Sequence, residues 1–306
     1  MRIGAIFPQL ESGVDPSAIR DYAQAVEDLG YSHLLTYDHV LGAGTANRPN
    51  WRGAYNSDSL FHEPFVLFGY LAAITHRLEL VTGVLILPQR QTALVAKQAT
   101  EVDVLSGGRL RLGVGVGWNP IEYTALNEDF ATRGARSEEQ IAALRALWQS
   151  TSVTIDGKWT HIRDAGINPL PVRRSIPIWL GGQAEPVLRR VGRLGDGWFP
   201  QMAPDEQARA MLERIHTAAR EAGRDPAAIG VEARLSPGQT PQKEWVSYAE
   251  AWRTLGATHL GVNTMGAGCD NLGDHIALLA RVKQELGAFT WHGARTQGGF
   301  SRNPGG

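Results

Sequence analysis

The sequence is poor in cysteine and lacks long apolar runs. Cys269 is the only cysteine among 306 residues, so neither an internal disulfide nor a cysteine-rich metal site can form, which favours a reducing compartment. No apolar run reaches the roughly 18 residues of a membrane span. The opening MRIGAIFPQL enters a strand directly and does not have the pattern of a signal peptide. We therefore expect a cytoplasmic protein that does not insert into a membrane.

Blocks of like charge and metal-binding histidine pairs are also missing. The 30 Lys and Arg residues nearly balance 31 Asp and Glu, for a net charge of −1. This balance provides no electrostatic footprint for nucleic acid or an anionic membrane, so we expect a small-molecule partner. No H-x-H or H-E-x-x-H spacing occurs, and we expect no catalytic metal.

What the sequence does contain is a regular alternation of β-branched runs with helical patterns. Such alternation is typical of a parallel sheet covered by helices, and eight units favour a closed (β/α)8 TIM barrel over an open sheet. We predict a single domain over residues 1–287. The predicted strands are residues 2–7, 32–37, 78–87, 110–118, 176–180, 197–200, 229–235 and 258–263. The predicted helices are residues 18–29, 65–75, 134–149, 186–194, 205–222, 243–255 and 272–286, with one more between the third and fourth strands.

Three segments lie outside this minimal barrel. Residues 41–60 form a long polar loop after the second strand, and we predict that it acts as a lid over the C-terminal face, where barrel active sites form. Residues 152–163 alternate around Asp156-Gly157 and predict a structural β-hairpin inserted before the fifth strand. Residues 288–306 are rich in Gly, Arg and Ser and are expected to be a disordered tail.

Glycines gather within one predicted strand and directly after another. Gly113, Gly115 and Gly117 are two residues apart, so one face of the fourth strand carries no side chains and a flat ligand can approach its backbone. Gly181-Gly182 lies between a strand and a helix, where backbone N–H groups can hold a phosphate, although tight turns also use glycine for steric reasons alone. Together the glycines favour a cofactor with a flat ring and a phosphate.

Five segments, in order, resemble the bacterial luciferase-like flavin- or deazaflavin-dependent oxidoreductases, a superfamily of (β/α)8 barrels. The resemblance extends from residue 1 to about residue 287. The segments are Tyr37-Asp38-His39, Thr82-Gly83-Val84, KQAT at 97–100 with LSGGR at 105–109, the glycines of 113–117 with Trp118-Asn119, and Gly181-Gly182 with GDGW at 195–198.

The resemblance implies roles for individual residues. Gly83-Val84 match a bulge of the third strand, often with a non-prolyl cis peptide, that supports the ring system. Gly182 and Gln183 match a turn that grips the phosphate. His39 matches an imidazole near the reactive ring carbon in deazaflavin-dependent relatives. The implied cofactor-binding residues are Asp38, Thr82, Gly83, Val84, Gly115, Gly117, Gly181, Gly182 and Gln183.

His39 is the predicted catalytic residue. Hydride transfer needs a group that moves the accompanying proton, and histidine ordinarily titrates near neutral pH. An isolated histidine at a strand end would be interpreted as a capping or hydrogen-bonded residue. The motif around His39 favours a catalytic role instead. His33 and His62 lack such a motif.

The predicted substrate pocket is aromatic. It includes Trp51, Tyr55 and Trp118, although large aromatic residues are also common in plain packing. A sugar-phosphate dehydrogenase of the superfamily would have glutamate where Trp118 stands, so we do not expect a sugar phosphate. Glu122 is interpreted as a loop or helix-start carboxylate rather than a catalytic acid. Arg234 is predicted to meet either an anion or an ion-pair partner, and Arg109 to form a structural salt bridge.

The predicted activity is that of an oxidoreductase using the deazaflavin coenzyme F420 on a small organic substrate. The alternatives are an FMN-dependent monooxygenase that uses reduced flavin, oxygen and a separate reductase, and a relative that binds flavin without turnover. The family also implies a homodimer through the helices after the second and third strands. The apolar residues that suggest this surface are Phe65, Leu67, Phe68 and Leu71.

Overall fold

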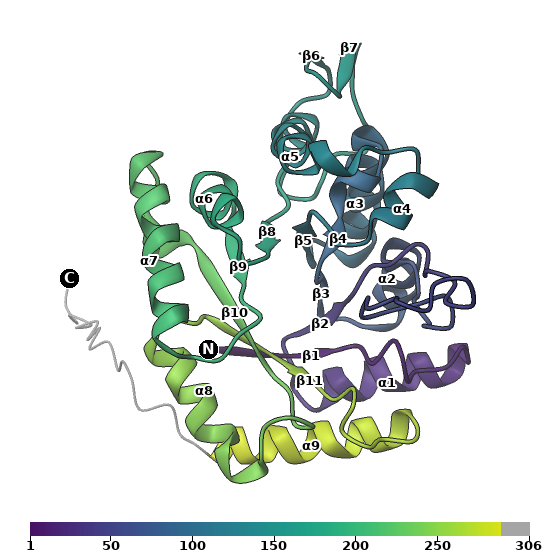
Figure 1. Cartoon of the computed structure of the whole chain (residues 1–306), viewed down its shortest axis with the longest axis vertical. Coiled ribbons are helices and arrows are strands. Elements are labelled where there is room, and N and C mark those ends of the chain that lie inside the picture. Colours follow the sequence, from purple (N-terminus) through teal and green to yellow (C-terminus); the bar gives the residue numbers. More distant parts are fainter. Residues whose placement is uncertain (289–306) are drawn as a thin grey trace, which may run out of the picture.

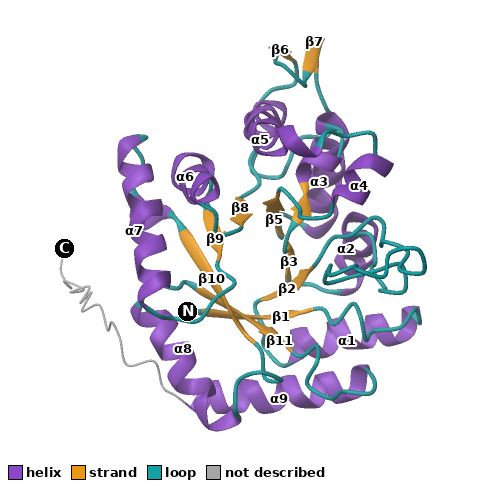
Figure 2. Ribbon diagram, viewed as in Figure 1, coloured by secondary structure: helices purple, strands orange, loops and turns teal. Residues whose placement is uncertain are grey.

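A computed structural model describes residues 1–288, which form a closed barrel of parallel strands surrounded by helices (Figures 1 and 2). The strand order is β3-β2-β1-β11-β10-β9-β8-β5, and pairing of β3 with β5 closes the ring. The predicted (β/α)8 TIM barrel is confirmed. The barrel strands are β1 (Arg2–Ile6), β2 (His33–Thr36), β3 (Glu79–Thr82), β4 (Leu85–Ile86), β5 (Leu110–Gly115), β8 (Ile178–Gly181), β9 (Gly197–Phe199), β10 (Gly230–Leu235) and β11 (His259–Asn263).

The helices pack on the outside of the barrel because each buries one stripe. In α1, Ile19, Tyr22, Ala23 and Val26 are buried at helical spacing, and Asp15 caps the helix by accepting a hydrogen bond from the Ser17 N–H. The helices are α1 (Pro16–Asp28), α2 (Pro64–Ile74), α3 (Thr92–Ser106), α4 (Pro120–Ala125), α5 (Arg133–Gln149), α6 (Glu185–Leu194), α7 (Glu206–Glu221), α8 (Trp245–Thr254) and α9 (Leu272–Ala288). The short helix α4 was not predicted.

The predicted hairpin is present and projects from the body of the molecule (Figure 1). It consists of β6 (Val153–Asp156) and β7 (His161–Ala165), which pair antiparallel. The Glu139 side chain on α5 accepts hydrogen bonds from three backbone N–H groups of the turn, those of residues 158–160. The turn is therefore anchored to the barrel through one carboxylate.

The third barrel strand contains one extra residue between β3 and β4. Leu80 pairs with Leu110 whereas Leu85 pairs with Val114, so a step of five residues runs beside a step of four. A bulge of this kind makes two consecutive residues face the same side and reverses the alternation beyond it. Val81 faces the barrel interior before the bulge and Val84 after it.

The barrel interior has an apolar layer above a charged one. Ile6, Leu35, Val81, Trp179 and Phe199 form the apolar layer. Below it, Glu232 accepts hydrogen bonds from Arg111 Nη1 at 2.6 Å and from the His33 ring at 2.8 Å. All three side chains are buried, so the interior is filled with paired groups rather than left as a pore.

The residues that suggested a dimer surface lie in the core. Phe65, Leu67, Phe68 and Leu71 are each at most 6% exposed. These four side chains lie on the face of α2 that packs into the core, whereas Val66 on the same helix is 73% exposed, so the four residues give no reason to expect a partner. None of the helices in residues 1–288 has the length and apolar content to cross a membrane. Of the predicted tail, residues 289–306 lie outside the described residues.

Candidate functional site

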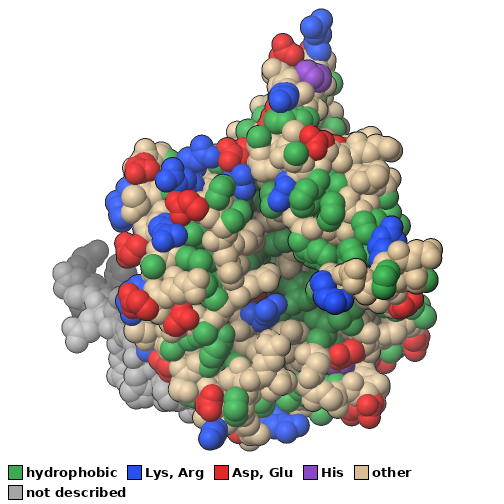
Figure 3. All heavy atoms as spheres, viewed as in Figure 1, with side chains coloured by type: hydrophobic (Ala, Val, Ile, Leu, Met, Phe, Trp, Pro, Cys, Tyr) green, Lys and Arg blue, Asp and Glu red, His purple; other side chains and the backbone are tan. Residues whose placement is uncertain are grey.

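A cavity of about 450 Å³ opens at the carboxyl ends of the strands. Figure 3 shows the molecule hollowed at its centre, with hydrophobic side chains on the walls and Lys or Arg side chains at the margin. Part of the loop at residues 41–60 covers the cavity through Arg52 and Tyr55, where the lid was predicted. The predicted site residues that line it are Asp38, His39, Tyr55, Gly83, Val84, Trp118 and Arg234.

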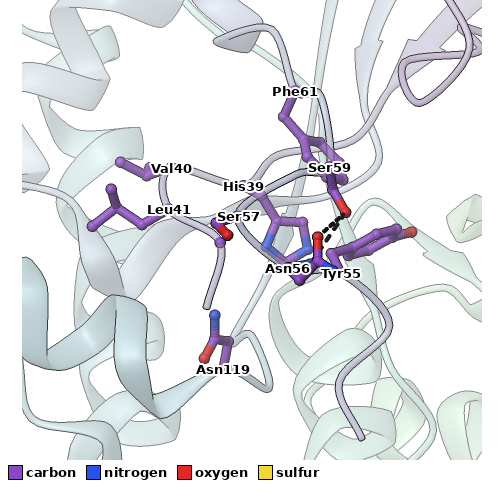
Figure 4. A pocket seen from close by; sticks show the side chains of 10 residues that line it. His39, Val40, Leu41, Tyr55, Asn56, Ser57, Ser59, Phe61 and Asn119 are labelled. Carbon is purple, nitrogen blue, oxygen red and sulfur yellow. Dashed lines mark hydrogen bonds between the residues drawn. The ribbon is translucent and has the colours of Figure 1, made fainter. Parts of the chain in front are cut away.

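His39 lines this cavity and also a second one of about 280 Å³, whose lining residues are drawn in Figure 4. The rings of Tyr55 and Phe61 have their centroids 4.8 Å from the His39 ring, and that of Trp118 is 5.7 Å away. These edge contacts restrict rotation of the imidazole. Its Nδ1 lies 3.2 Å from Glu122 Oε2, and no residue among 1–288 forms a hydrogen bond to Nε2.

Glu122 is the residue whose importance the sequence did not reveal. It is 1% exposed on α4 and accepts hydrogen bonds from the N–H groups of Val40 and Leu41 at 2.9 and 3.2 Å. Burial alone would raise the pKa of Glu122, but the His39 contact and the two N–H donors outweigh it, so the pKa lies below its usual value. The sequence contained one sign of this helix. Asn119-Pro120 is a typical helix start, and it follows the glycine-containing strand at the end of the barrel where active sites form.

Asp38 also has a supporting position. Its Oδ1 lies 2.8 Å from Arg90 Nη2 and its Oδ2 accepts the N–H of Ile86 at 3.0 Å. Burial raises the pKa of Asp38, and Arg90, which also binds Glu63, opposes that shift. Both carboxylate oxygens of Asp38 therefore bind the protein, although the residue lines the cavity as predicted.

The glycines of the fourth barrel strand make room for the bulge. A Cβ on Gly113 would lie 1.9 Å from the Thr82 carbonyl oxygen, and one on Gly115 would lie 2.4 Å from Val84 Cγ2. A Cβ on Gly83 would lie 2.3 Å from Leu35. Protein atoms therefore occupy the space that a Cβ would take at each of these glycines. Gly83 nevertheless lines the cavity, and contact of a flat ligand with these glycines stays a prediction. The Gly83–Val84 peptide is cis, as the resemblance implied.

Residues 3–298 match the family described as luciferase-like monooxygenases. The chain belongs to this family. An uncharacterized protein of Mycobacterium tuberculosis is 32% identical over 223 residues, 71% of this chain and 77% of that protein. Pyrimidine monooxygenase RutA of Allorhizobium ampelinum is 31% identical over 215 residues, 67% of this chain and 56% of RutA. The structure of an F420-dependent secondary alcohol dehydrogenase in complex with an F420-acetone adduct superposes with a TM-score of 0.75 at 17% identity, covering 93% of this chain and 98% of that one.

In this luciferase-like protein the backbone conformation of the predicted phosphate turn requires glycine at residue 182. Gly182 has φ of +125°, a region that side chains disfavour, and its carbonyl accepts the Trp198 indole N–H at 2.8 Å. Gln183 donates to the carbonyl of Gln201, which lines the cavity. The predicted cofactor-binding residues outside the cavity lining are Thr82, Gly115, Gly117, Gly181, Gly182 and Gln183.

Thr82, Gly117 and Gly181 pack against the strands of the luciferase-like barrel. Thr82 is fully buried and donates to the Gly113 carbonyl at 2.7 Å. A Cβ on Gly117 would lie 2.8 Å from Ile86, and one on Gly181 would lie 2.9 Å from Val84. These residues therefore support the bulge from outside the cavity, and any contact of theirs with a cofactor stays a prediction.

The predicted substrate residues divide into two groups. Tyr55, Trp118 and Arg234 line the cavity, and the one hydrogen bond of the Arg234 guanidinium within residues 1–288 is to the Tyr37 hydroxyl at 3.5 Å. Trp51 stands behind Trp118, with ring centroids 5.9 Å apart.

Arg109 is structural in this family member, but not through a salt bridge. It donates to the carbonyl groups of Ala72, Thr75, Leu78 and Ser106. It therefore fastens the end of α2 to the end of α3. Within residues 1–288, no three His, Cys, Asp or Glu side chains come together in a way that would hold a metal ion.

Proposed function

We propose that this protein is an F420-dependent oxidoreductase that transfers hydride between the deazaflavin and a small organic substrate. The observation that carries the proposal is the position of His39. Its Nε2 has no hydrogen-bond partner among residues 1–288, and the ring lines the same 450 Å³ cavity as Val84. Luciferase-like family membership and the likeness to the F420-dependent alcohol dehydrogenase support the cofactor assignment.

The cavity suits a flat aromatic cofactor with polar edges. Val84, Ile86 and Trp118 give it apolar walls, and its volume lies within the usual range for small-molecule sites. Asp38 is the carboxylate that lines it, and Arg90 neutralises that charge, so a deazaflavin would meet no unpaired negative charge. The bound deazaflavin supplies the carbon that donates or accepts hydride.

The residues of this chain would position the reactants, limit access of water to the cavity and carry the proton. His39 accepts or returns the proton that accompanies hydride transfer at the substrate oxygen. Residues 41–60 contribute Arg52 and Tyr55 to the cavity lining, and closure of this loop over a bound cofactor would exclude water and strengthen electrostatic interactions inside the cavity. Arg234 offers a cationic group to an anionic part of the substrate or cofactor, since it has no carboxylate partner within residues 1–288.

Titration with the two candidate cofactors tests the proposal. The purified protein should bind F420 more tightly than FMN, measured by quenching of tryptophan or cofactor fluorescence, and should reduce or oxidise F420 with a substrate from a panel of alcohols, ketones and enones. Binding of FMN without F420 would replace the proposal with the monooxygenase alternative. No binding of either would favour the non-catalytic relative.

The likeness to RutA supports the monooxygenase as the second candidate. In that case the protein would consume oxygen, and a separate reductase would supply reduced FMN. Oxygen uptake with reduced FMN in an oxygen-electrode assay distinguishes the two, because F420 hydride transfer consumes none.

A homodimer remains part of the proposal, on a surface that differs from the residues first considered. Val66 and Tyr70 on α2 and Leu94 on α3 are 73%, 38% and 52% exposed. Sedimentation at micromolar concentration should give twice the chain mass, and Val66→Glu should shift the protein towards monomer. A wild-type monomer would contradict the dimer.

A further inference from the structure

The contact between Glu122 and His39 has a consequence for the proton on the imidazole. We propose that Glu122 is a positioning residue that holds a proton on Nδ1 of His39 and so keeps Nε2 free to take up a proton from the reaction. This inference rests on the proposed function, because it assigns His39 its direction of proton transfer. The carboxylate acts through the histidine and does not touch the substrate.

The two oxygens of Glu122 have separate partners. Oε1 accepts the N–H groups of Val40 and Leu41 at 2.9 and 3.2 Å, and Oε2 lies 3.2 Å from Nδ1 of His39. An ionised carboxylate can only accept hydrogen bonds, so the nitrogen facing it must donate. In neutral imidazole one nitrogen carries the proton and the other accepts, so a proton on Nδ1 leaves Nε2 as the acceptor.

Glu122 stays ionised because its surroundings favour the charge. The residue is 1% exposed, and a buried carboxylate without donors would become neutral. The two backbone N–H groups belong to the segment that directly follows His39, so the carboxylate fixes the ring and its backbone together. The same negative charge stabilises the imidazolium that forms when Nε2 takes up a proton.

No other described acidic group competes for this ring. Asp38, the neighbouring carboxylate, gives its oxygens to Arg90 and to the Ile86 N–H. Arg52 and Arg234 line the same cavity and oppose a positive charge on His39. Tyr55 and Phe61 contact the ring through their faces and edges, which are neutral. Glu122 is therefore the group that offsets the two arginines.

The decisive variant is Glu122→Gln. Its side-chain oxygen can still accept from Val40 and Leu41, while its NH₂ group faces Nδ1 of His39 and forces that nitrogen to accept. The proton then moves to Nε2, the nitrogen that should accept from the reaction. We expect kcat to fall by about 10²-fold or more, towards the loss of the base itself. The pH profile of kcat should change as well, because the negative charge beside the ring is gone.

The tautomer can be measured without any cofactor. In ¹⁵N-labelled wild-type protein at alkaline pH, NMR assigned with the His39→Ala variant should show His39 protonated at Nδ1, and Glu122→Gln should show it protonated at Nε2. Wild type protonated at Nε2 would overturn the inference even if the variant failed to fold. An unchanged tautomer or an unmoved pH profile in Glu122→Gln would also overturn it.

Glu27→Gln is the matched control. Glu27 is likewise buried, and it accepts N–H groups of residues 76–78 without contacting an imidazole ring. It should lose stability in the same way but leave the His39 tautomer and the pH profile unchanged. If the tautomer result holds and F420 turnover is not found, the proposed function fails while the arrangement of Glu122 and His39 stands.

Discussion

The surroundings of His39 are built largely by residues that are distant from it in the sequence, with Glu122 on one side of the ring and Tyr55 and Phe61 on others. The motif Tyr37-Asp38-His39 was sufficient to single out His39. It could not reveal Glu122, because the two residues are 83 positions apart and meet only when the barrel closes. Asp38 lines the cavity, as the motif suggested, and the structure adds that its oxygens bind Arg90 and the Ile86 N–H.

Replacing His39 by alanine should separate rate from binding. A positioned general acid or base contributes roughly 10² to 10⁴ in rate, so His39→Ala should lose that much turnover while its Kd for cofactor changes little. The control is His161→Ala, since the His161 side chain in the hairpin is 66% exposed. Full activity of His39→Ala, or loss of cofactor binding together with activity, would make the histidine structural.

Gly83→Val should lower stability as well as cofactor binding. The new Cβ would lie 2.3 Å from the Leu35 side chain in the barrel interior, and overpacking of this kind costs about 1–3 kcal/mol. Gly69→Val is the control, because a Cβ at Gly69 on α2 would meet no atom within 4 Å. Urea denaturation measures both variants. A Gly83→Val protein as stable as wild type would show that Leu35 moves aside freely.

At the scale of elements, the existence of strands and helices could be predicted but not the bulge. The third strand reads LELVTGVLIL, apolar on nearly every residue after Glu79, so no polar position marks which face is inside. The pairing register with β5 determines which face lies inside, and this register forms only in the folded barrel. Helix α4 has only six residues, too short for a periodic pattern.

The ion pair that joins the segment after β2 to the segment after β4 should be expensive to break. Asp38 is 1% and Arg90 14% exposed at the side chain, and Arg90→Met would leave the carboxylate buried without its cation. Removing one partner of a buried pair costs about 3–5 kcal/mol. The control Arg189→Met breaks an exposed pair with Glu185 and should cost much less stability, because water screens that pair. Equal losses in chemical denaturation would contradict the distinction.

At the scale of the whole molecule, counting βα units was enough to predict a closed barrel, because the period of the pattern determines which elements can neighbour each other. What fills the barrel was not predictable in this way. Arg111, His33 and Glu232 come from three distant strands, and each looks like a surface residue until the ring closes. The charged layer should make stability depend on pH.

His259, whose partly buried ring lies with its centroid 5.6 Å from that of His33, predicts the direction of that dependence. Burial, followed by the nearby charges of Arg111 and His33, lowers the pKa of His259 to about 3, whereas an unfolded histidine titrates near 6.5. Between these values the unfolded chain binds a proton that the folded chain does not, so stability is complete above about pH 6.5 and falls towards pH 3. His259→Gln should lose less stability than wild type between pH 7 and pH 4 in denaturant titrations. Parallel curves would contradict this, and His161→Gln is the exposed control.

The extra residue of the third strand also determines how the chain tolerates a change in its length. If Gly83 is deleted, Val81, Val84 and Ile86 still alternate with Thr82 and Leu85, so every remaining side chain keeps its face in an unbulged strand. Removing the whole residue should therefore disturb packing less than adding three carbons to it. The deletion would instead draw the Thr82 carbonyl away from Gly113 and leave a void there, and it would remove one of the residues that line the cavity. A single deletion at residue 83 would therefore separate what this position contributes to stability from what it contributes to the cavity.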